Sequence, residues 1–135
     1  MSEQKPMHSV QIPIRWNDVD VFGHVNNAVY FTYMEIVRFD WVSGLVGTLP
    51  AGEAPVVVTT QCTFLRQLTF PGTVELALFA GPPGRSSVET RYEFRRVGEP
   101  DTVYAEGTAK LVWVNLAAQK SVPLPAALRE LLEHP

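Results

Sequence analysis

The side chains best suited to chemistry lie in one short segment, Trp16–Tyr30, which reads WNDVDVFGHVNNAVY. It holds two aspartates, Asp18 and Asp20, together with His24 and the pair Asn26–Asn27. A carboxylate can attack a carbonyl carbon or take a proton from water. If a helix begins directly after the segment, its free backbone N–H groups can stabilise the oxyanion formed in such an attack. The segment is therefore a candidate active site for attack on a carbonyl group.

Metal binding explains this segment less well. Asp18, Asp20 and Gly23 match the first, third and sixth positions of a calcium-binding EF-hand loop, but Phe22 and Val29 stand where that loop needs oxygen ligands. A transition-metal site is also poorly supported, because a single histidine accompanies the two carboxylates. We therefore expect no metal here.

Helix capping is the simpler alternative. Asparagine and aspartate are favoured before a first helical turn, so Asn26 or Asn27 alone would satisfy a helix start. Capping leaves Asp20 and His24 without a role, which favours the active-site hypothesis. No Ser-His-Asp arrangement, glycine-rich phosphate loop or dinucleotide-binding fingerprint is visible elsewhere in the sequence.

A long helix is predicted from about Asn27 to Val46. Apolar residues recur at three- and four-residue spacing, and further apolar residues interrupt the opposite side. A helix that is apolar on nearly all sides is a buried one. Asn26 or Asn27 is expected to cap its start, and Gly44 or Gly47 to end it. The apolar face consists of Tyr30, Tyr33, Met34, Val37, Trp41 and Leu45.

Strand patterns stand on both sides of this helix. Residues 9–15 alternate, with Val10, Ile12 and Ile14 on one side and Pro13 at a position typical of an edge strand or a bulge. Four further runs are joined by the turn sequences FPG, PPGR and GEPD, which predict that consecutive strands are antiparallel neighbours. A short amphipathic helix with Pro125 in its first turn follows. The four runs are residues 56–68, 73–81, 86–97 and 102–116.

These elements predict an α+β fold in which an antiparallel sheet of about five strands covers one long helix. Such a helix needs more cover than a flat sheet offers, so we expect a strongly twisted sheet or self-association. The length favours one domain, residues 1–135. The net charge of −3 provides no basic field for nucleic acid.

The remaining composition bears on the compartment. No apolar run reaches the roughly 18 residues of a membrane span, and the first residues lack a signal-peptide core. We therefore expect no membrane segment. The one cysteine, Cys62, allows no intrachain disulfide, which favours a cytoplasmic location. Its alternating surroundings indicate a packed thiol rather than a nucleophile.

The stretch from Arg15 to Val42, RWNDVDVFGHVNNAVYFTYMEIVRFDWV, resembles the start of hotdog-fold acyl-CoA thioesterases of the 4-hydroxybenzoyl-CoA thioesterase group. Within that group it is most similar to long-chain acyl-CoA thioesterases with an HVNN segment. Weaker similarity continues through TFLRQLTFPG, GRSSVETRYEF and AKLVWVNLAAQKSVPLP, so the resemblance covers nearly the whole chain. The matching residues are Arg15, Asp18, Asp20, Gly23, His24, Val25, Asn26, Asn27, Tyr30, Tyr33, Glu35 and Arg38.

The resemblance implies a hotdog fold, in which an antiparallel sheet wraps one long central helix. It implies hydrolysis of acyl-CoA thioesters without a cofactor. It also implies a homodimer with active sites at the subunit interface, and such dimers often pair into tetramers.

The resemblance further assigns roles in the candidate active site. Asp20 corresponds to the catalytic carboxylate, and the backbone N–H of Asn27, placed by its spacing from Gly23, corresponds to the oxyanion donor. Asp18 is expected to accept hydrogen bonds from loop N–H groups. His24 either orients a water or a thioester oxygen or braces the loop. The acyl chain is expected along the apolar side of the helix, near Tyr30, Tyr33 and Met34.

Relatives hold the CoA phosphates with basic side chains outside the pocket, which here implies Arg85 beside Ser86 and, less strongly, Arg66. A second hotdog subgroup uses a glutamate on the central helix, but Arg38 lies three residues after Glu35, which favours an ion pair between them. Two other functions stay open. Hotdog hydratases or dehydratases carry a D-x-N-x-x-H motif that we do not find, and a non-catalytic acyl-CoA-binding protein would bind without hydrolysis.

Overall fold

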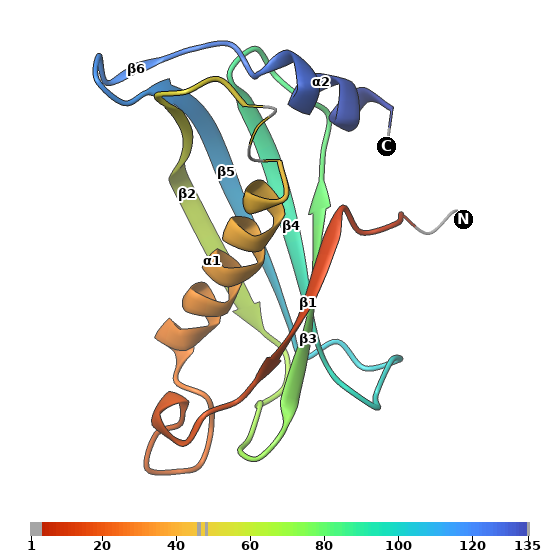
Figure 1. Cartoon of the computed structure of the whole chain (residues 1–135). Helices are drawn as coiled ribbons and strands as arrows, with labels where there is room; N and C mark the ends of the chain where they lie inside the picture. Colours follow the sequence, from red (N-terminus) through yellow and green to blue (C-terminus); the bar gives the residue numbers. More distant parts are fainter. Residues whose placement is uncertain (1–3, 46, 48, 135) are drawn as a thin grey trace.

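A single curved antiparallel sheet wraps around a central helix in the computed structural model, which describes residues 4–45, 47 and 49–134 (Figure 1). The sheet and helix confirm the predicted α+β hotdog architecture. The elements in chain order are β1 (His8–Pro13), the short 3₁₀ turn η1 (Trp16–Asp18), α1 (Asn27–Ser43), β2 (Glu53–Phe64), β3 (Thr73–Ala80), β4 (Ser87–Arg96), β5 (Ala105–Asn115), β6 (Lys120–Ser121) and α2 (Ala126–Glu133).

The five long strands lie in the order β1-β3-β4-β5-β2, and the short β6 pairs with β5. Pro13 ends β1, an edge strand, as its missing N–H requires. The hairpins β3–β4 and β4–β5 confirm the turns predicted at PPGR and GEPD. β2 and β1 form the two edges, so β2 lies far from β3 in the sheet.

The prediction that β2 and β3 are hairpin neighbours is wrong. β2 ends at Phe64 instead of continuing to Leu68, and it pairs with β5. Leu68 is fully buried, and its carbonyl accepts a hydrogen bond from the N–H of Val25 at 2.8 Å. The segment between the two strands therefore crosses the end of the sheet next to the start of α1. The burial of Leu68 at this place stabilises the crossing path over a hairpin.

α1 begins at Asn27, as predicted, and ends at Ser43, whereas the predicted end, Val46, lies outside the described residues. The Asn26 side chain caps the first turn by accepting a hydrogen bond from the N–H of Ala28 at 2.9 Å. Gly44 ends the helix, and its N–H bonds back to the carbonyl of Trp41 at 3.2 Å. The helix therefore starts and stops on the local signals that its sequence carries.

The core lies between α1 and the inner face of the sheet. Gly107 of β5 allows the closest approach, because a Cβ atom at this position would lie 2.8 Å from the sulfur of Met34. Cys62 is half-buried on β2, and burial raises the pKa of its thiol to about 11, as expected of a packed thiol. The buried α1 residues are Tyr30, Tyr33, Met34, Val37 and Trp41, five of the six predicted for its apolar face.

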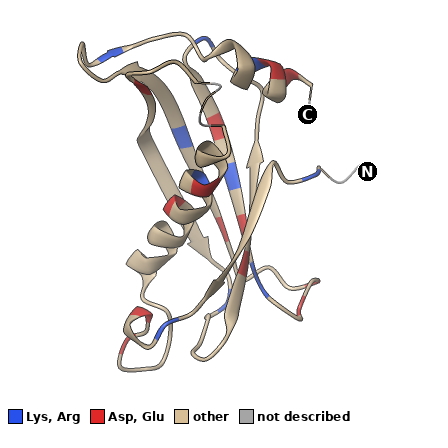
Figure 2. Cartoon of the chain, viewed as in Figure 1, with Lys and Arg blue, Asp and Glu red and all other residues tan. Residues whose placement is uncertain are grey.

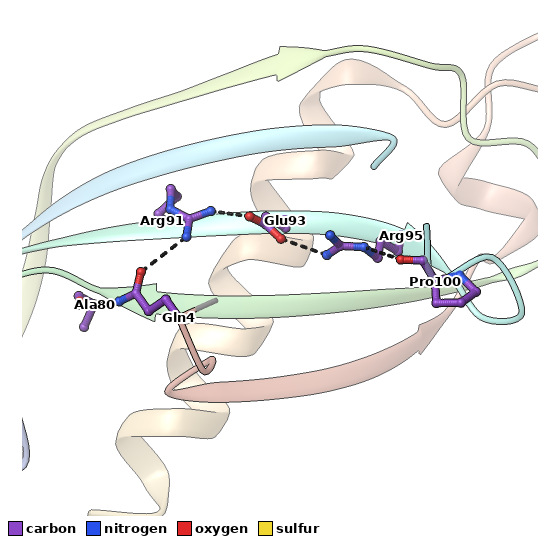
Figure 3. Close-up of polar contacts among 6 residues, drawn as sticks. All are labelled: Gln4, Ala80, Arg91, Glu93, Arg95 and Pro100. Carbon is purple, nitrogen blue, oxygen red and sulfur yellow. Dashed lines mark hydrogen bonds and ion pairs between the residues drawn. The ribbon is translucent and has the colours of Figure 1, made fainter. Parts of the chain in front are cut away.

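The outer face of the sheet carries paired charges (Figure 3). Glu93 accepts hydrogen bonds from Arg91 and, at 2.8 Å, from Arg95. Gln4, from the segment before β1, donates to the carbonyl of Ala80 at 3.1 Å. Basic and acidic residues are interspersed over the molecule rather than gathered on one basic face (Figure 2). Among the described residues, no helix is long and apolar enough to cross a membrane.

Candidate active site

The loop between β1 and α1 is anchored by Asp18, which is only 2% exposed. Its carboxylate accepts hydrogen bonds from the Arg15 backbone N–H at 2.9 Å, the Arg15 guanidinium at 3.0 Å and the Tyr33 hydroxyl at 2.7 Å. Burial by itself would raise the pKa of Asp18, but these donors together hold it below its ordinary value. Burial and the Asp18 contact raise the pKa of the Tyr33 hydroxyl, so Tyr33 remains a donor.

Asp20 lies in the same loop but faces solvent. Its Oδ1 accepts hydrogen bonds from the backbone N–H groups of Phe22, at 2.9 Å, and His24, at 3.3 Å. Gly23 completes this tight turn with a φ of +77°, a conformation that favours glycine. Within the described ranges, no arginine, lysine or histidine side chain pairs with Asp20, and its Oδ2 accepts no hydrogen bond.

The start of α1 adjoins this loop. Val19 pairs with Val25, and the N–H of Asn26 donates to the carbonyl of Asp18 at 2.9 Å, so the loop folds back onto the helix start. The cap uses the N–H of Ala28, whereas the N–H of Asn27 has no acceptor in the part of the chain that the structure describes. Asp20 and a free helical N–H therefore lie at the same end of the molecule.

His24 lies between these two groups in the sequence and is half-buried. Its backbone pairs with Thr69 of the β2–β3 crossing segment, which braces the loop. Its imidazole makes no hydrogen bond to any described residue, and its ring lies 6.5 Å from that of Phe22. The backbone contacts thus support bracing, and the free ring nitrogens leave the water-orienting alternative available.

An exposed apolar rim surrounds the loop, which sequence reasoning did not predict. Val21 is 94% and Phe22 is 79% exposed, and Trp16 packs edge-on against Phe70 with ring centroids 5.6 Å apart. The sequence signal for this rim was the apolar pair Val21–Phe22 between Asp20 and Gly23, since apolar side chains are unusual at the tip of a polar loop. Such a rim suits an apolar ligand or a second protein surface.

The structure does not bring the predicted acyl-chain residues to a cavity. Tyr30, Tyr33 and Met34 are each at most 2% exposed. The Tyr33 hydroxyl donates a hydrogen bond to Asp18, and the Tyr30 hydroxyl accepts a weak hydrogen bond from the N–H of Leu68 at 3.4 Å. These side chains fill the core because they share the apolar face that packs against the sheet.

The predicted CoA-binding residues lie at opposite ends of the molecule. Arg85 and Ser86 form the β3–β4 turn beside α2, at the far end from the Asp20 loop (Figure 1). The Arg85 guanidinium donates to the Ser86 hydroxyl at 3.0 Å. Arg66 follows β2 at the Asp20 end, where it is exposed. One chain therefore brings Arg66, and not Arg85, to the end that carries Asp20.

Glu35 and Arg38 make no ion pair, although their spacing predicted one; this holds for the described part of the chain. Arg38 instead donates to the hydroxyl of Tyr92 at 3.4 Å. Glu35 is exposed to solvent. An ion pair there would restrict two long side chains, and the entropy lost would offset most of the small electrostatic gain. Over residues 4–45, 47 and 49–134 there is also no group of three or more His, Cys, Asp or Glu side chains that could hold a metal ion.

Comparison with solved structures places the fold among thioesterases. The PA2801 protein of Pseudomonas aeruginosa, a candidate thioesterase, is 38% identical over 93% of this chain and 98% of that chain, with a TM-score of 0.87. A candidate acyl-CoA thioesterase from Xanthomonas campestris is 34% identical over 82% and 95%, with a TM-score of 0.74. A thioesterase from Thermus thermophilus complexed with coenzyme A and zinc is 29% identical over 95% and 98%, with a TM-score of 0.76.

The family comparison agrees with these structures. The model of the Thioesterase-like superfamily matches residues 14–132, which include the whole loop from Arg15 to Asn27. Family and neighbours together support thioester hydrolysis as the general reaction. Because the match spans most of its length, the chain belongs to the Thioesterase-like superfamily.

Proposed function

We propose that this protein hydrolyses acyl-CoA thioesters to a carboxylic acid and CoA, with Asp20 as the catalytic carboxylate. The observation that carries the proposal is that two groups lie at the same end of the molecule. They are the exposed Asp20 carboxylate, which has no cationic partner among the described residues, and the N–H of Asn27, which has no acceptor there. Two structural neighbours, a candidate acyl-CoA thioesterase and a thioesterase complexed with coenzyme A, support CoA as the thiol part of the substrate.

In the proposed reaction, the thioester carbonyl oxygen accepts a hydrogen bond from the Asn27 N–H. This donor and the positive end of α1 stabilise the negative charge that develops as the carbonyl carbon is attacked. Asp20 either adds to that carbon, forming an anhydride that water then cleaves, or removes a proton from an attacking water. In both routes the C–S bond breaks, and CoA leaves as a thiolate that takes up a proton.

The surrounding residues support this arrangement. Gly23 lets the loop turn so that Oδ1 of Asp20 is held by two backbone N–H groups while Oδ2 stays free. Asp18 ties the loop to α1 through Tyr33. His24 braces the loop through its backbone, and its ring, which makes no hydrogen bond to a described residue, is the group we propose to orient water. We assign the protein to the 4-hydroxybenzoyl-CoA thioesterase group, near the long-chain enzymes with an HVNN segment, as a single thioesterase domain over residues 1–135.

We further propose that two copies pair along the free edge of β2. This strand carries three exposed valines in succession, of which Val58 is 52% exposed, and its outer backbone groups have no partner strand in the part of the chain that the structure describes. Antiparallel pairing of two such edges sets the Arg85–Ser86 end of one copy towards the Asp20 end of the other. CoA phosphates would then meet Arg66 of the same chain and the Arg85 turn of the second copy, and such dimers would pair into tetramers.

The experiment is a thiol-release assay across short, long and aromatic acyl-CoAs, run with the wild type and Asp20→Asn. We expect turnover of at least one class and a loss of about 10³-fold in the variant, by analogy with other catalytic side chains. Near-normal kcat in Asp20→Asn would overturn the assignment of Asp20. Tight acyl-CoA binding without thiol release would instead indicate a binding protein, and hydration of crotonyl-CoA would indicate a hydratase.

A single-turnover reaction in ¹⁸O-labelled water can identify attack by Asp20. Attack by Asp20 followed by hydrolysis at its own carboxyl carbon places the label in the protein. Base catalysis places the label in the product acid alone, as does hydrolysis of the anhydride at the acyl carbon, so label in the protein is the outcome that identifies the covalent route.

A further inference from the structure

A groove of about 300 Å³ opens between α1 and the edge strand β2. Its walls are mostly apolar and are formed by Phe39 and Val42 of α1, Val56 of β2 and Leu111 of β5. Two charged side chains of α1, Glu35 and Arg38, also line it. We call this the α1–β2 groove. A cavity with apolar walls and one or two charged groups is typical of a small-molecule site.

Arg38 differs from the other arginines in its surroundings. Five arginines make ion pairs with a carboxylate, namely Arg15, Arg91, Arg95, Arg96 and Arg129. Among the described residues, Arg38, Arg66 and Arg85 make none, and of these three only Arg38 is half-buried. A half-buried guanidinium that no protein carboxylate engages can form strong charge-assisted hydrogen bonds to a ligand, so a ligand carboxylate in the groove would supply the missing anion.

The orientation of Arg38 is set by a chain of hydrogen bonds. The Thr90 hydroxyl donates to the carbonyl of Ala109 at 2.8 Å, so the Tyr92 hydroxyl must donate to Thr90 across their 2.6 Å contact. The Tyr92 oxygen is thereby left to accept from Arg38 at 3.4 Å, and the guanidinium lies 5.8 Å from the Tyr92 ring centroid. This neutral acceptor uses one of the five N–H donors of Arg38, and the others remain for a ligand.

The groove lies along the helix from the proposed oxyanion donor. Asn27, Phe31, Glu35 and Phe39 follow each other at four-residue steps on one side of α1. Arg38 lies eleven residues after Asn27, which corresponds to roughly 17 Å along the helix axis. An extended acyl group with its carbonyl at Asn27 would therefore place its far end at Arg38 if it were long enough.

We propose that the α1–β2 groove receives the far end of the acyl group, and that Arg38 selects acyl groups ending in a carboxylate. The preferred substrates are then CoA half-thioesters of long-chain dicarboxylic acids. This inference rests on the proposed acyl-CoA hydrolysis. A carboxylate fits because the planar guanidinium can hold both of its oxygens at once. Glu35 opposes it with a repulsion that water reduces but does not remove, because Glu35 is exposed. The groove reaches the free edge of β2, since Pro55, Val56 and Val57 all line it, so the second copy in the proposed dimer would border the groove.

The test compares kcat/KM for hexadecanedioyl-CoA and hexadecanoyl-CoA, which differ only at the far end of the chain. We expect the wild type to prefer the dicarboxylic substrate by about 10- to 100-fold, the value of a charge-assisted hydrogen bond pair. Arg38→Gln should abolish this preference, and Arg38→Lys should retain part of it. Arg91→Gln, on the outer face of the sheet, is the matched control and should leave the preference unchanged. An equal ratio in the wild type and Arg38→Gln would overturn the inference.

A second variant covers the case in which Arg38→Gln does not fold. Glu35 is exposed, so Glu35→Gln should fold and should raise the preference for the dicarboxylic substrate severalfold by removing a like charge. An unchanged ratio in Glu35→Gln would also overturn the inference.

The outcomes separate this inference from the proposed function. Hydrolysis that depends on Asp20 but shows no dependence on Arg38 contradicts the inference alone. If no acyl-CoA is hydrolysed, the proposed function fails, and calorimetric titration of the wild type and Arg38→Gln with hexadecanedioate then decides. Binding that is lost in Arg38→Gln supports the groove as its site, and absent binding or equal binding to both proteins overturns the inference.

Discussion

Asp18 and Asp20 are separated by one residue and lie in opposite environments. Asp18 is buried and accepts hydrogen bonds from Arg15 and Tyr33. Asp20 is exposed and is held only by two backbone N–H groups through one of its oxygens. The first carboxylate therefore shapes the loop, whereas the second keeps an oxygen free. Two identical side chains acquire different tasks because their surroundings differ.

A similar contrast separates the two faces of the sheet. On the outer face, Glu93 is paired with both Arg91 and Arg95 (Figure 3). On the inner side, Arg38 has a tyrosine hydroxyl and no carboxylate partner in the described ranges. Groups whose interactions are complete stabilise the structure, and groups whose interactions are incomplete are the better candidates for binding and chemistry.

The largest expected effect is a loss of activity without a loss of stability in Asp20→Asn. The amide oxygen can still accept hydrogen bonds from Phe22 and His24, so the loop should keep its shape. We expect turnover to fall by about 10³-fold and the free energy of unfolding to change by less than about 0.5 kcal/mol. Thiol release and urea denaturation measure the two quantities. Asp101→Asn, another exposed position, is the control, and a large loss of stability in Asp20→Asn would contradict the comparison.

Asp18→Ala should show the opposite pattern, with stability as the first loss. The substitution leaves the Tyr33 hydroxyl and the Arg15 backbone N–H without their acceptor in a buried place. We expect a cost of about 2–4 kcal/mol, towards the lower end because the Arg15 guanidinium is exposed and can be hydrated. Urea denaturation followed by circular dichroism measures it. Wild-type stability with reduced turnover would reverse the roles of the two aspartates.

The pH dependence of stability should also identify Asp18. Its folded-state pKa lies below the unfolded value, so its contribution is complete above about pH 4 and is lost as the pH falls through the folded pKa. We expect the free energy of unfolding to decline below about pH 4 in the wild type and less steeply in Asp18→Asn. Urea titrations from pH 6 to pH 2 test this, and parallel profiles would count against the assignment.

Tyr33→Phe should produce the smallest effect. It removes the 2.7 Å hydrogen bond to Asp18 and keeps the buried ring. We expect a loss of about 1–2 kcal/mol, since the bond is to a charged group, and little change in kcat. A double-mutant cycle with Asp18→Ala, which removes the acceptor, isolates the coupling between the two side chains. Zero coupling energy would show that Tyr33 does not anchor the loop.

Much of the fold could be predicted because its signals are local. The Asn26 cap and the apolar spacing located α1, and alternation located the strands. The error lay at FPG, where a short turn sequence indicated a hairpin. The chain instead passes from the edge strand β2 across the end of the sheet to β3, which lies next to the opposite edge strand β1. Which strands pair depends on contacts between residues far apart in the chain, such as buried Leu68 with Tyr30, and no pattern within a few residues carries that information.

The structure places Asp20 in an exposed loop before α1 and leaves the N–H of Asn27 without an acceptor among the described residues, and the catalytic roles of both residues stay predictions. Burial of Tyr30, Tyr33 and Met34 differs from the expected acyl pocket, because the apolar face of a central helix packs on the sheet first. The β3–β4 turn, which holds Arg85, lies beside α2 at the opposite end of the sheet from the β1–α1 loop, which holds Asp20 (Figure 1). A turn at either end of a strand looks alike in sequence, so the sequence could not show this.

The sequence by itself determined where α1 starts, which of its faces is apolar, and that a carboxylate-bearing loop precedes it. Periodicity and capping decide these features, and both act over a few residues. Only the tertiary structure decided which aspartate is buried, which strand forms the free edge, and that Arg38 lines a groove without an acidic partner among the described residues. Those features depend on contacts such as Tyr33 with Asp18 and β2 with β5, which join residues far apart in the chain.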